Sequence, residues 1–506
     1  KLGITHIWYT GVIEHATQTN YEEYGIKTDH PAIVKGVAGS PYAIKDYFDI
    51  DPDLAVDPNK RMQEFQNLVN RTHKAGLKVI IDFVPNHVAR QYYSDKQPNN
   101  VTKNFSPYNN FYYIPETQLY PQFDTKGDQK EAYYEFPAKV TGNDGFNANP
   151  NFNDWYDTVK LNYGVDFLNG HNKHFDPIPD TWHKMLEIIM FWASKKIDGF
   201  RCDMAEMVPV EFWAWAVPQV KARYPEFIFI GEVYQPHLYK TFIETCRFDY
   251  LYDKVGLYET IRNVIVGNQS ARDISYCWQS LDGIQSHMLN FLENHDEQRI
   301  ASAFFAVNPF KAIPGLVISA CMNTNPMMIY FGQELGEMSM DTEGYSGRDG
   351  RTSIFDYWSI STIRRWRNKG KFGSKDLSKT ELELQSLYQN ILNLCHTEDA
   401  IAKGEFFDLM YANIDGWKFN QDKQYTFLRK FKNELLLIAV NLDDQKVDVA
   451  INIPSHACEH LKIKETQSIA GVDLLSGKQK EYSLLINKAT TISIPKYGAK
   501  IIKFTL

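Results

Sequence analysis

An arginine and an aspartate two residues apart, Arg201 and Asp203, end a segment that has the pattern of a short buried strand. Side chains at positions i and i+2 of a strand point to the same face, so the guanidinium would lie beside the carboxylate. A neighbouring cation favours the ionised carboxyl, which a nucleophile or a metal ligand requires. We therefore predict that Asp203 is ionised at neutral pH, although a structural ion pair would use the same two residues.

Polar side chains follow several other apolar runs in the same way. The carboxyl ends of parallel strands in a closed barrel share one mouth, so residues distant in sequence can converge there. Acids, two histidines and one arginine are thus expected to face one pocket. The residues at these predicted strand ends are Asp82, Asn86 and His87, then Arg201 and Asp203, then Glu232, and finally Asn294, His295 and Asp296.

Glu232 follows the apolar run Phe-Ile-Phe-Ile-Gly, a setting expected to keep its carboxyl protonated as a general acid. A protonated carboxyl paired with an ionised one is what cleavage of a glycosidic bond needs. Asp296 could hold a sugar diol, and histidines suit sugar hydroxyls. Each residue has an ordinary alternative: Asp82 could hold a turn, Glu232 could be a surface acid and His87 a core histidine. Their joint occurrence favours a site.

The elements that must position these residues alternate along the chain. Strands are predicted over residues 4–9 and 77–84, a loop over 21–55 and a helix over 59–75. Further strand and helix alternation up to residue 403 is typical of a parallel α/β sheet. Residues 88–165 interrupt it and are interpreted as an inserted subdomain. Residues 404–506 show short alternating segments and are interpreted as an antiparallel domain, which leaves residues 1–87 and 166–403 for the α/β domain.

The composition limits the kinds of partner and of structural cross-link that the chain is expected to have. The chain has 506 residues, of which 43% are hydrophobic, and a net charge of −8 with no basic run, so nucleic acid is not an expected partner. No apolar run reaches the roughly 18 residues that a membrane span needs. Six scattered cysteines without a C-x-x-C pair indicate neither a zinc site nor a disulfide framework. Oligomeric state and compartment are left open.

Four segments resemble, in order, the four conserved blocks of the α-amylase family, glycoside hydrolase family 13. The resemblance implies a (β/α)8 TIM barrel, a B subdomain inserted after the third strand, a C-terminal β-sandwich and a retaining mechanism. The expected distance between the two central carboxyls is then about 5 Å. The segments are Asp82-Phe-Val-Pro-Asn-His87, Gly199-Phe-Arg-Cys-Asp203, Gly231-Glu232 and Glu293-Asn-His-Asp296.

The resemblance also implies roles for single residues. Asp203 matches the nucleophile, Glu232 the general acid/base and Asp296 the acid that stabilises the transition state. Tyr42 matches an aromatic residue that stacks under the sugar at the cleavage point. The residues expected to complete that subsite are His87, Arg201 and His295.

The sequence differs from the family pattern at its start and in the segment after Asp203. Family members have a barrel strand and helix before the block that residues 3–9 resemble, so we expect these two elements upstream of Lys1. Glu206 and Met207 stand where many amylases carry Lys-His, and we expect them to contact sugar on the leaving-group side. This difference speaks against ordinary endo-amylase specificity.

Val159-Lys-Leu-Asn162 resembles a block of the neopullulanase and cyclomaltodextrinase branch. Many amylases place a calcium-binding aspartate where Lys160 stands, and an ammonium group would repel Ca²⁺. We therefore expect that the usual inter-domain calcium site is lost and that no cofactor is required. The Asn/Asp-rich run 143–154 could bind a cation, but it has no regular ligand spacing and is interpreted as a loop.

The sequence-based hypothesis is an α-glucan hydrolase that cleaves α-1,4 bonds in maltooligosaccharides, cyclodextrins, pullulan or starch, with or without transglycosylation. Alternatives within the class are a starch endo-α-amylase and an α-glucosidase. A glycan-binding pseudo-enzyme is the alternative outside catalysis, and such proteins lose one or more of the acids. Asp203, Glu232 and Asp296 are all present, which favours an enzyme.

Overall fold

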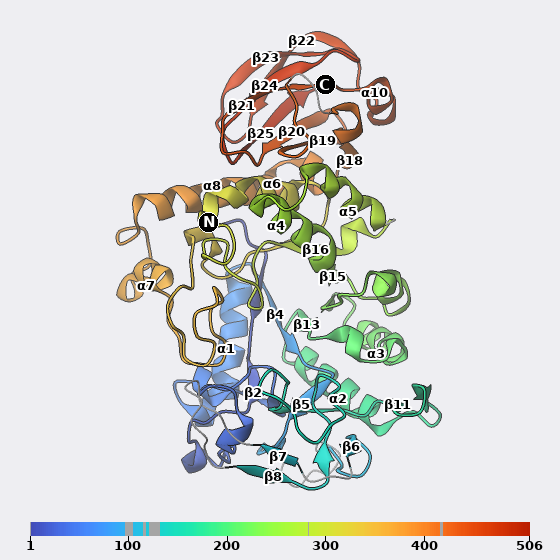
Figure 1. The fold of residues 1–506 in the computed structure, drawn as a ribbon, viewed down its shortest axis with the longest axis vertical. Coiled ribbons are helices and arrows are strands. Elements are labelled where there is room, and N and C mark those ends of the chain that lie inside the picture. Colours follow the sequence, from blue (N-terminus) through green and yellow to red (C-terminus); the bar gives the residue numbers. More distant parts are fainter. Residues whose placement is uncertain (1, 97–104, 115–117, 121–131, 282, 415–417) are drawn as a thin grey trace.

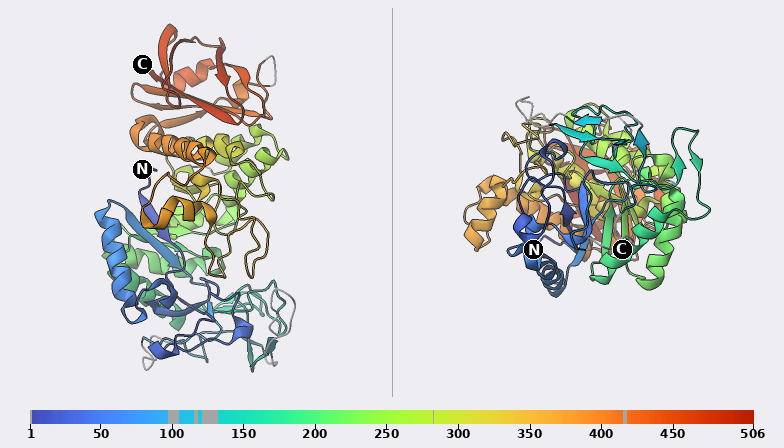
Figure 2. Two further views of the ribbon diagram at one scale, coloured as in Figure 1. Left: turned by 90° about the vertical axis from the view of Figure 1, so that its left-hand side faces the viewer. Right: turned by 90° about the horizontal axis from the view of Figure 1, so that it is seen from below.

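A computed structural model describes residues 2–96, 105–114, 118–120, 132–281, 283–414 and 418–506 (Figure 1). Three parts of the predicted inserted subdomain, residues 97–104, 115–117 and 121–131, therefore lie outside the described residues. The long axis of the molecule carries three regions in succession. An antiparallel sheet forms one end, a parallel sheet with its helices lies in the middle, and short strand pairs form the other end (Figures 1 and 2).

The middle region is built on a sheet of seven parallel strands whose spatial order follows the chain, as expected when helices connect successive strands. This order confirms the predicted parallel α/β architecture. The strands are β1 (His6–Tyr9), β4 (Lys78–Phe83), β13 (Gly199–Cys202), β14 (Ile228–Gly231), β15 (Tyr250–Tyr252), β16 (Met288–Phe291) and β17 (Met327–Met328).

The two outermost strands, β1 and β17, are each paired on one side in the described part of the sheet. A cavity of about 1310 Å³ lies along the inner face of the sheet and is lined by residues of both edges. Apolar side chains such as Ile230 and Met327 line it, and it reaches Arg201 and His295 from inside the sheet. The expectation of a strand and a helix upstream of Lys1 stays a prediction.

Helices cover the outer face of this sheet (Figure 1). Helix α1 shows why: it buries Phe65, Val69 and Thr72, three or four residues apart, so that one stripe faces the sheet. None of the helices in the described ranges is long and apolar enough to cross a membrane. The helices are α1 (Arg61–Lys74), α2 (Asp180–Ser194), α3 (Val210–Arg223), α4 (Glu259–Val266), α5 (Ile274–Ser280), α6 (Ile313–Cys321), α7 (Ser361–Arg367), α8 (Lys379–Thr397) and α9 (Asp399–Ala402).

Part of the predicted loop over residues 21–55 is a strand, so that prediction was wrong there. Strand β3 (Ile44–Ile50) pairs with β2 (Ile13–His15), and all seven of its residues are buried. Three of them, Lys45, Asp46 and Asp49, carry ionisable side chains. The sequence therefore lacks the apolar alternation by which a strand is predicted. Their burial is compensated by partners: Lys45, for example, lies 2.8 Å from the Asp29 carboxylate.

Short antiparallel pairs fill the region between β4 and α2. Strand β5 (His87–Ala89) pairs with β10 (Thr158–Lys160), which ties the start of this region to its end. The boundaries proposed from the sequence at residues 88, 166 and 404 stay predictions. The other pairs are β6 (Tyr113–Ile114) with β9 (Ala138–Lys139), β7 (Gln118–Tyr120) with β8 (Tyr133–Glu135), and β11 (Val165–Asp166) with β12 (Asn172–Lys173).

The C-terminal region contains a six-stranded antiparallel sheet in the order β18-β19-β20-β25-β22-β23 and a second pair, β21-β24. It packs on α6 and α9, and Arg429 of β19, fully buried, donates to main-chain oxygens of Ala400 and Met322. The predicted antiparallel domain is confirmed. Its elements are β18 (Glu405–Asp408), β19 (Gln424–Phe431), β20 (Glu434–Asn441), β21 (Val447–Ile451), α10 (Ser455–Leu461), β22 (Thr466–Asp473), β23 (Gln479–Leu484), β24 (Thr490–Ile494) and β25 (Gly498–Thr505).

Candidate active site

One buried arginine joins the acids at the carboxyl ends of β4, β13 and β14. Arg201 Nη1 lies 2.8 Å from Asp203 Oδ1 and 3.5 Å from Asp82 Oδ1. Its Nη2 lies 2.7 Å from Glu232 Oε2. The predicted neighbourhood of Arg201 and Asp203 is therefore present, and the same guanidinium also reaches Glu232, which the sequence did not indicate. The predicted distance of about 5 Å between the two carboxyls stays a prediction.

Three buried carboxyls lie beside a single positive charge here, so burial disfavours the ionised form of each of them. Burial raises the pKa of Asp203 well above its ordinary value, and Arg201 opposes that shift. Burial likewise raises the pKa of Asp82 to about 6, again against the attraction of Arg201. The ionised state of Asp203 expected from its arginine neighbour therefore competes with the cost of burying charge.

The surroundings of Glu232 differ from the apolar setting expected from the sequence. Its Oε2 accepts a hydrogen bond from Met204 N at 2.8 Å, besides the contact with Arg201. Its Oε1 lies 2.5 Å from the Tyr234 hydroxyl. The apolar residues before Glu232 fill the sheet, whereas its own side chain turns into the polar mouth. The carboxyl of Glu232 is therefore buried among polar partners and not among apolar side chains, and its role as general acid stays a prediction.

Tyr42 and His295 form a stacked pair at this mouth. Their ring centres are 5.4 Å apart at 22°, and the Tyr42 hydroxyl lies 2.6 Å from His295 Nε2. Burial and the positive charge of Arg201 lower the pKa of His295 to about 3, so the imidazole is neutral at ordinary pH. Asp296 Oδ2 lies 3.2 Å from the same nitrogen, and its side chain is 46% exposed. Asp296 thus lies at the open side of the cluster.

His87 lies at the neighbouring strand end. Burial and the nearby Lys160 ammonium lower the pKa of His87 to about 3, which keeps it neutral. A methyl group on Gly142 would lie 2.9 Å from His87 Cγ and 2.5 Å from Thr158 Oγ1, so only glycine fits there. The inserted region therefore packs directly against a predicted site residue.

Glu206 and Met207, expected to contact substrate, lie on the turn after β13. Glu206 Oε2 accepts hydrogen bonds from Tyr234 N at 2.8 Å and Gln235 N at 3.0 Å. Met207 Sδ lies 3.8 Å from Asn86 Nδ2. The structure thus places Glu206 as a support for the segment after β14, and the sugar contacts of both residues stay predictions.

Three further aromatic residues take part in the cluster, and two of them, Trp8 and Tyr252, were not predicted to belong to the site. Trp8 Nε1 donates to Asp82 Oδ2 at 3.0 Å, and Tyr252 OH accepts from Arg201 Nε at 3.2 Å. The guanidinium lies 5.3 Å from the Trp8 ring and 5.5 Å from the Tyr252 ring. Tyr234 is the third. Trp8 falls in the predicted strand over residues 4–9, so the face that it shares with the site could have been predicted from strand alternation.

Lys160 and its neighbours, where the resemblance implies a calcium site in many amylases, form a polar cluster. Lys160 Nζ lies 2.5 Å from Asp144 Oδ1 and 2.8 Å from Asn86 Oδ1, and Lys160 is buried. An ammonium group therefore lies among oxygen atoms of Asn86, after β4, and Asp144, in the inserted region. These residues do not fit Ca²⁺, which requires six to eight oxygen ligands.

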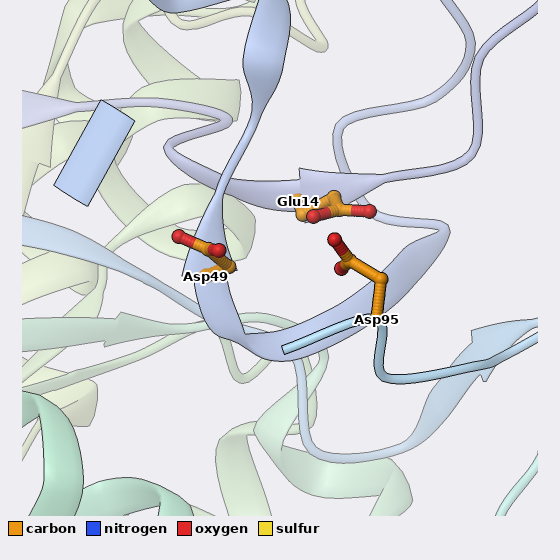
Figure 3. A group of neighbouring side chains, drawn as sticks. All are labelled: Glu14, Asp49 and Asp95. Atoms are coloured by element: carbon orange, nitrogen blue, oxygen red, sulfur yellow. The ribbon is translucent and has the colours of Figure 1, made fainter. Parts of the chain in front are cut away.

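A second acidic group is formed by residues of β2, of β3 and of the segment after β5. Glu14, Asp49 and Asp95 offer carboxylate oxygens within 4.8 Å of one another, and Asp95 points toward Glu14 (Figure 3). Arg61 Nη2 lies 2.8 Å from Asp49, 2.9 Å from Asp95 and 3.5 Å from Glu14. Lys96 Nζ lies 3.5 Å from Asp49 as well, so side-chain cations of the protein accompany this acidic group.

Parallel strands whose ends gather acids around one buried arginine, with neutral histidines beside them, define a barrel site of the glycosidase kind. The chain belongs to the α-amylase family, because the profile of the α-amylase catalytic domain matches residues 1–380.

Curated relatives agree with this assignment. Alpha-amylase 2 of Dictyoglomus thermophilum is 22% identical over 422 residues, which cover 82% of this chain and 60% of the relative. Neopullulanase 2 of Thermoactinomyces vulgaris is 22% identical over 425 residues, with 82% and 59% covered. Cyclomaltodextrinase of Thermoanaerobacter pseudethanolicus is 24% identical over 351 residues, with 66% and 53% covered. The chain spans at most about 60% of the length of these relatives.

Solved structures show the same fold. A maltogenic α-amylase from Thermotoga neapolitana has a TM-score of 0.63 at 20% identity, covering 100% of this chain and 91% of that one. An α-amylase from Geobacillus thermoleovorans has a TM-score of 0.63 at 16% identity, covering 100% and 89%. Both support the predicted barrel with a C-terminal antiparallel domain.

Proposed function

We propose that the protein is a retaining glycoside hydrolase that cleaves α-1,4-glucosidic bonds in maltooligosaccharides, cyclodextrins, pullulan or starch. The observation that carries the proposal is the contact of one buried guanidinium with both Asp203 and Glu232. Membership of the α-amylase family supports it, because the family model covers both residues and the resemblance of their segments to the family's blocks implies nucleophile and acid/base roles for them.

The geometry suggests a two-step reaction. Glu232 gives a proton to the glycosidic oxygen while the Asp203 carboxylate bonds to the anomeric carbon and the leaving sugar departs. Water then attacks that carbon, passes its proton to Glu232 and releases Asp203. Asp296, on the open side of the cluster, would bind hydroxyls of the distorted sugar, and Tyr42 would stack beneath the ring.

A neopullulanase-like specificity is the finer part of the proposal. It is supported by the absence of Lys-His at Glu206 and Met207, by the 159–162 block, and by relatives named neopullulanase and cyclomaltodextrinase. We further propose that catalysis needs no calcium at the inter-domain position, because Lys160 contacts Asp144 and Asn86 there.

Product analysis tests this function. The protein is incubated separately with maltoheptaose, cyclodextrin, pullulan and starch, and the products are separated by chromatography, with Asp203→Asn as the inactive control. Panose from pullulan together with fast ring opening of cyclodextrin is the expected result. Rapid loss of starch viscosity with intact cyclodextrin would favour an endo-α-amylase, glucose alone would favour an α-glucosidase, and no release would favour a glycan-binding pseudo-enzyme.

A further inference from the structure

We propose that Tyr234 is a positioning residue for the acid/base carboxyl: its hydroxyl holds the oxygen of Glu232 that carries the catalytic proton, and Glu206 holds Tyr234 in place. The inference rests on the proposed glycosidase function and adds two residues to its machinery.

The two oxygens of Glu232 have different neighbours. Oε2 faces Met204 N at 2.8 Å and Arg201 Nη2 at 2.7 Å, and both nitrogens carry hydrogen and cannot accept one. A proton on Oε2 would therefore point at donors. Oε1 faces the Tyr234 hydroxyl at 2.5 Å, and a phenol can either donate or accept. The proton of the acid form consequently belongs on Oε1.

Tyr234 is held by groups from two other segments. Glu206, on the turn after β13, accepts the main-chain N–H groups of Tyr234 and Gln235 on one carboxylate oxygen. Lys254, after β15, places its ammonium 5.4 Å from the centre of the Tyr234 ring. Burial and the Glu232 carboxylate raise the pKa of Tyr234, so the phenol stays neutral and can donate. The contacts with Glu206 and Lys254 therefore fix the position of the Tyr234 hydroxyl beside Glu232.

The Tyr234 hydroxyl accepts a hydrogen bond from the protonated Oε1 before bond cleavage and donates one to the ionised Oε1 afterwards. It neither gains nor loses a proton overall. The proton leaves Oε1 for the glycosidic oxygen as the bond from that oxygen to the anomeric carbon breaks. Oε1 is then ionised and accepts from the Tyr234 hydroxyl. In the second step water returns a proton to Oε1. Loss of the hydroxyl should therefore slow cleavage most for substrates whose leaving group must be protonated, and least for substrates whose leaving group departs without a proton.

The test compares two leaving groups in the Tyr234→Phe variant. Maltoheptaose needs a proton on its leaving oxygen, whereas α-maltosyl fluoride releases fluoride with little acid assistance. For Tyr234→Phe we expect kcat/KM to fall about 30-fold on maltoheptaose and less than about threefold on the fluoride. Tyr239→Phe is the matched control, because the buried Tyr239 hydroxyl has no hydrogen-bond partner in the described structure. It should match the wild type on both substrates.

Glu206 variants supply a second, independent measurement. Glu206→Ala should reproduce the leaving-group-dependent loss, and Glu206→Gln, which retains an oxygen acceptor, should restore most of the activity on maltoheptaose. The inference is overturned if Tyr234→Phe loses activity equally on both substrates or on neither. A wild-type protein that cleaves neither substrate would instead overturn the proposed function, so the two failures can be told apart.

Discussion

Arg201 and Glu232 are in contact, with Nη2 2.7 Å from Oε2, although they belong to neighbouring strand ends 31 positions apart in the sequence. The other terminal nitrogen of the same guanidinium lies 2.8 Å from Asp203. One cation thus bridges the two carboxyls on which the proposed reaction depends, and their charges cannot be changed independently.

Replacing Arg201 by lysine should separate the two acids. A single ammonium cannot reach both carboxylates as the planar guanidinium does, so we expect kcat/KM on maltoheptaose to fall by about 10³. Steady-state kinetics measure the loss. Arg223→Lys, at an exposed arginine near the end of α3, is the control and should be unchanged. Near-normal turnover in Arg201→Lys would contradict the bridging role.

Asp203→Asn and Glu232→Gln should each lower turnover by several orders of magnitude and leave the fold intact. The two losses should differ in kind. Glu232→Gln retains the nucleophile, so α-maltosyl fluoride should still form a covalent glycosyl-enzyme, detectable by mass spectrometry. Asp203→Asn should form none. A stable adduct on the Asp203→Asn variant would mean that another residue is the nucleophile.

Asp253 should make stability depend on pH. Burial raises its pKa from the ordinary 3.8 to about 6, so the folded state binds this proton more tightly than the unfolded chain. The stabilisation of the folded state by this proton is fully present below about pH 4 and is lost as the pH rises through about 6. Asp253→Asn removes the titration and should stabilise the protein at pH 8 relative to wild type by about 3 kcal/mol. Chemical denaturation should show this gain shrinking toward pH 4; an equal effect at both pH values would refute the assignment.

Chelation should leave activity unchanged if the ammonium of Lys160 takes the place of the inter-domain calcium. Dialysis against EDTA is expected to change neither Tm nor kcat/KM. Lys160→Met should instead lower Tm, because Asp144 and Asn86 lose their buried partner, and added Ca²⁺ should not restore it. A fall in activity with EDTA that Ca²⁺ reverses would contradict the proposal.

Local patterns were enough for the regular part of the fold. Apolar runs predicted strands that the structure contains as β1, β4, β13 and β14, and helical spacing predicted α1. Strand β3 was missed because its buried charged residues erase the apolar alternation, and their burial is tolerated only once partners such as Asp29 are in place.

The sequence by itself determined which residues gather at the strand ends, because parallel strands bring their carboxyl ends to one mouth whatever the loops do. It also indicated Arg201 beside Asp203, a relation that strand alternation imposes locally. Only the tertiary structure decided that Arg201 also contacts Glu232, that Glu206 supports Tyr234, and that Lys160 meets Asp144. These contacts join separate strand ends and loops, and their distances depend on how the segments pack, which no spacing along the chain encodes.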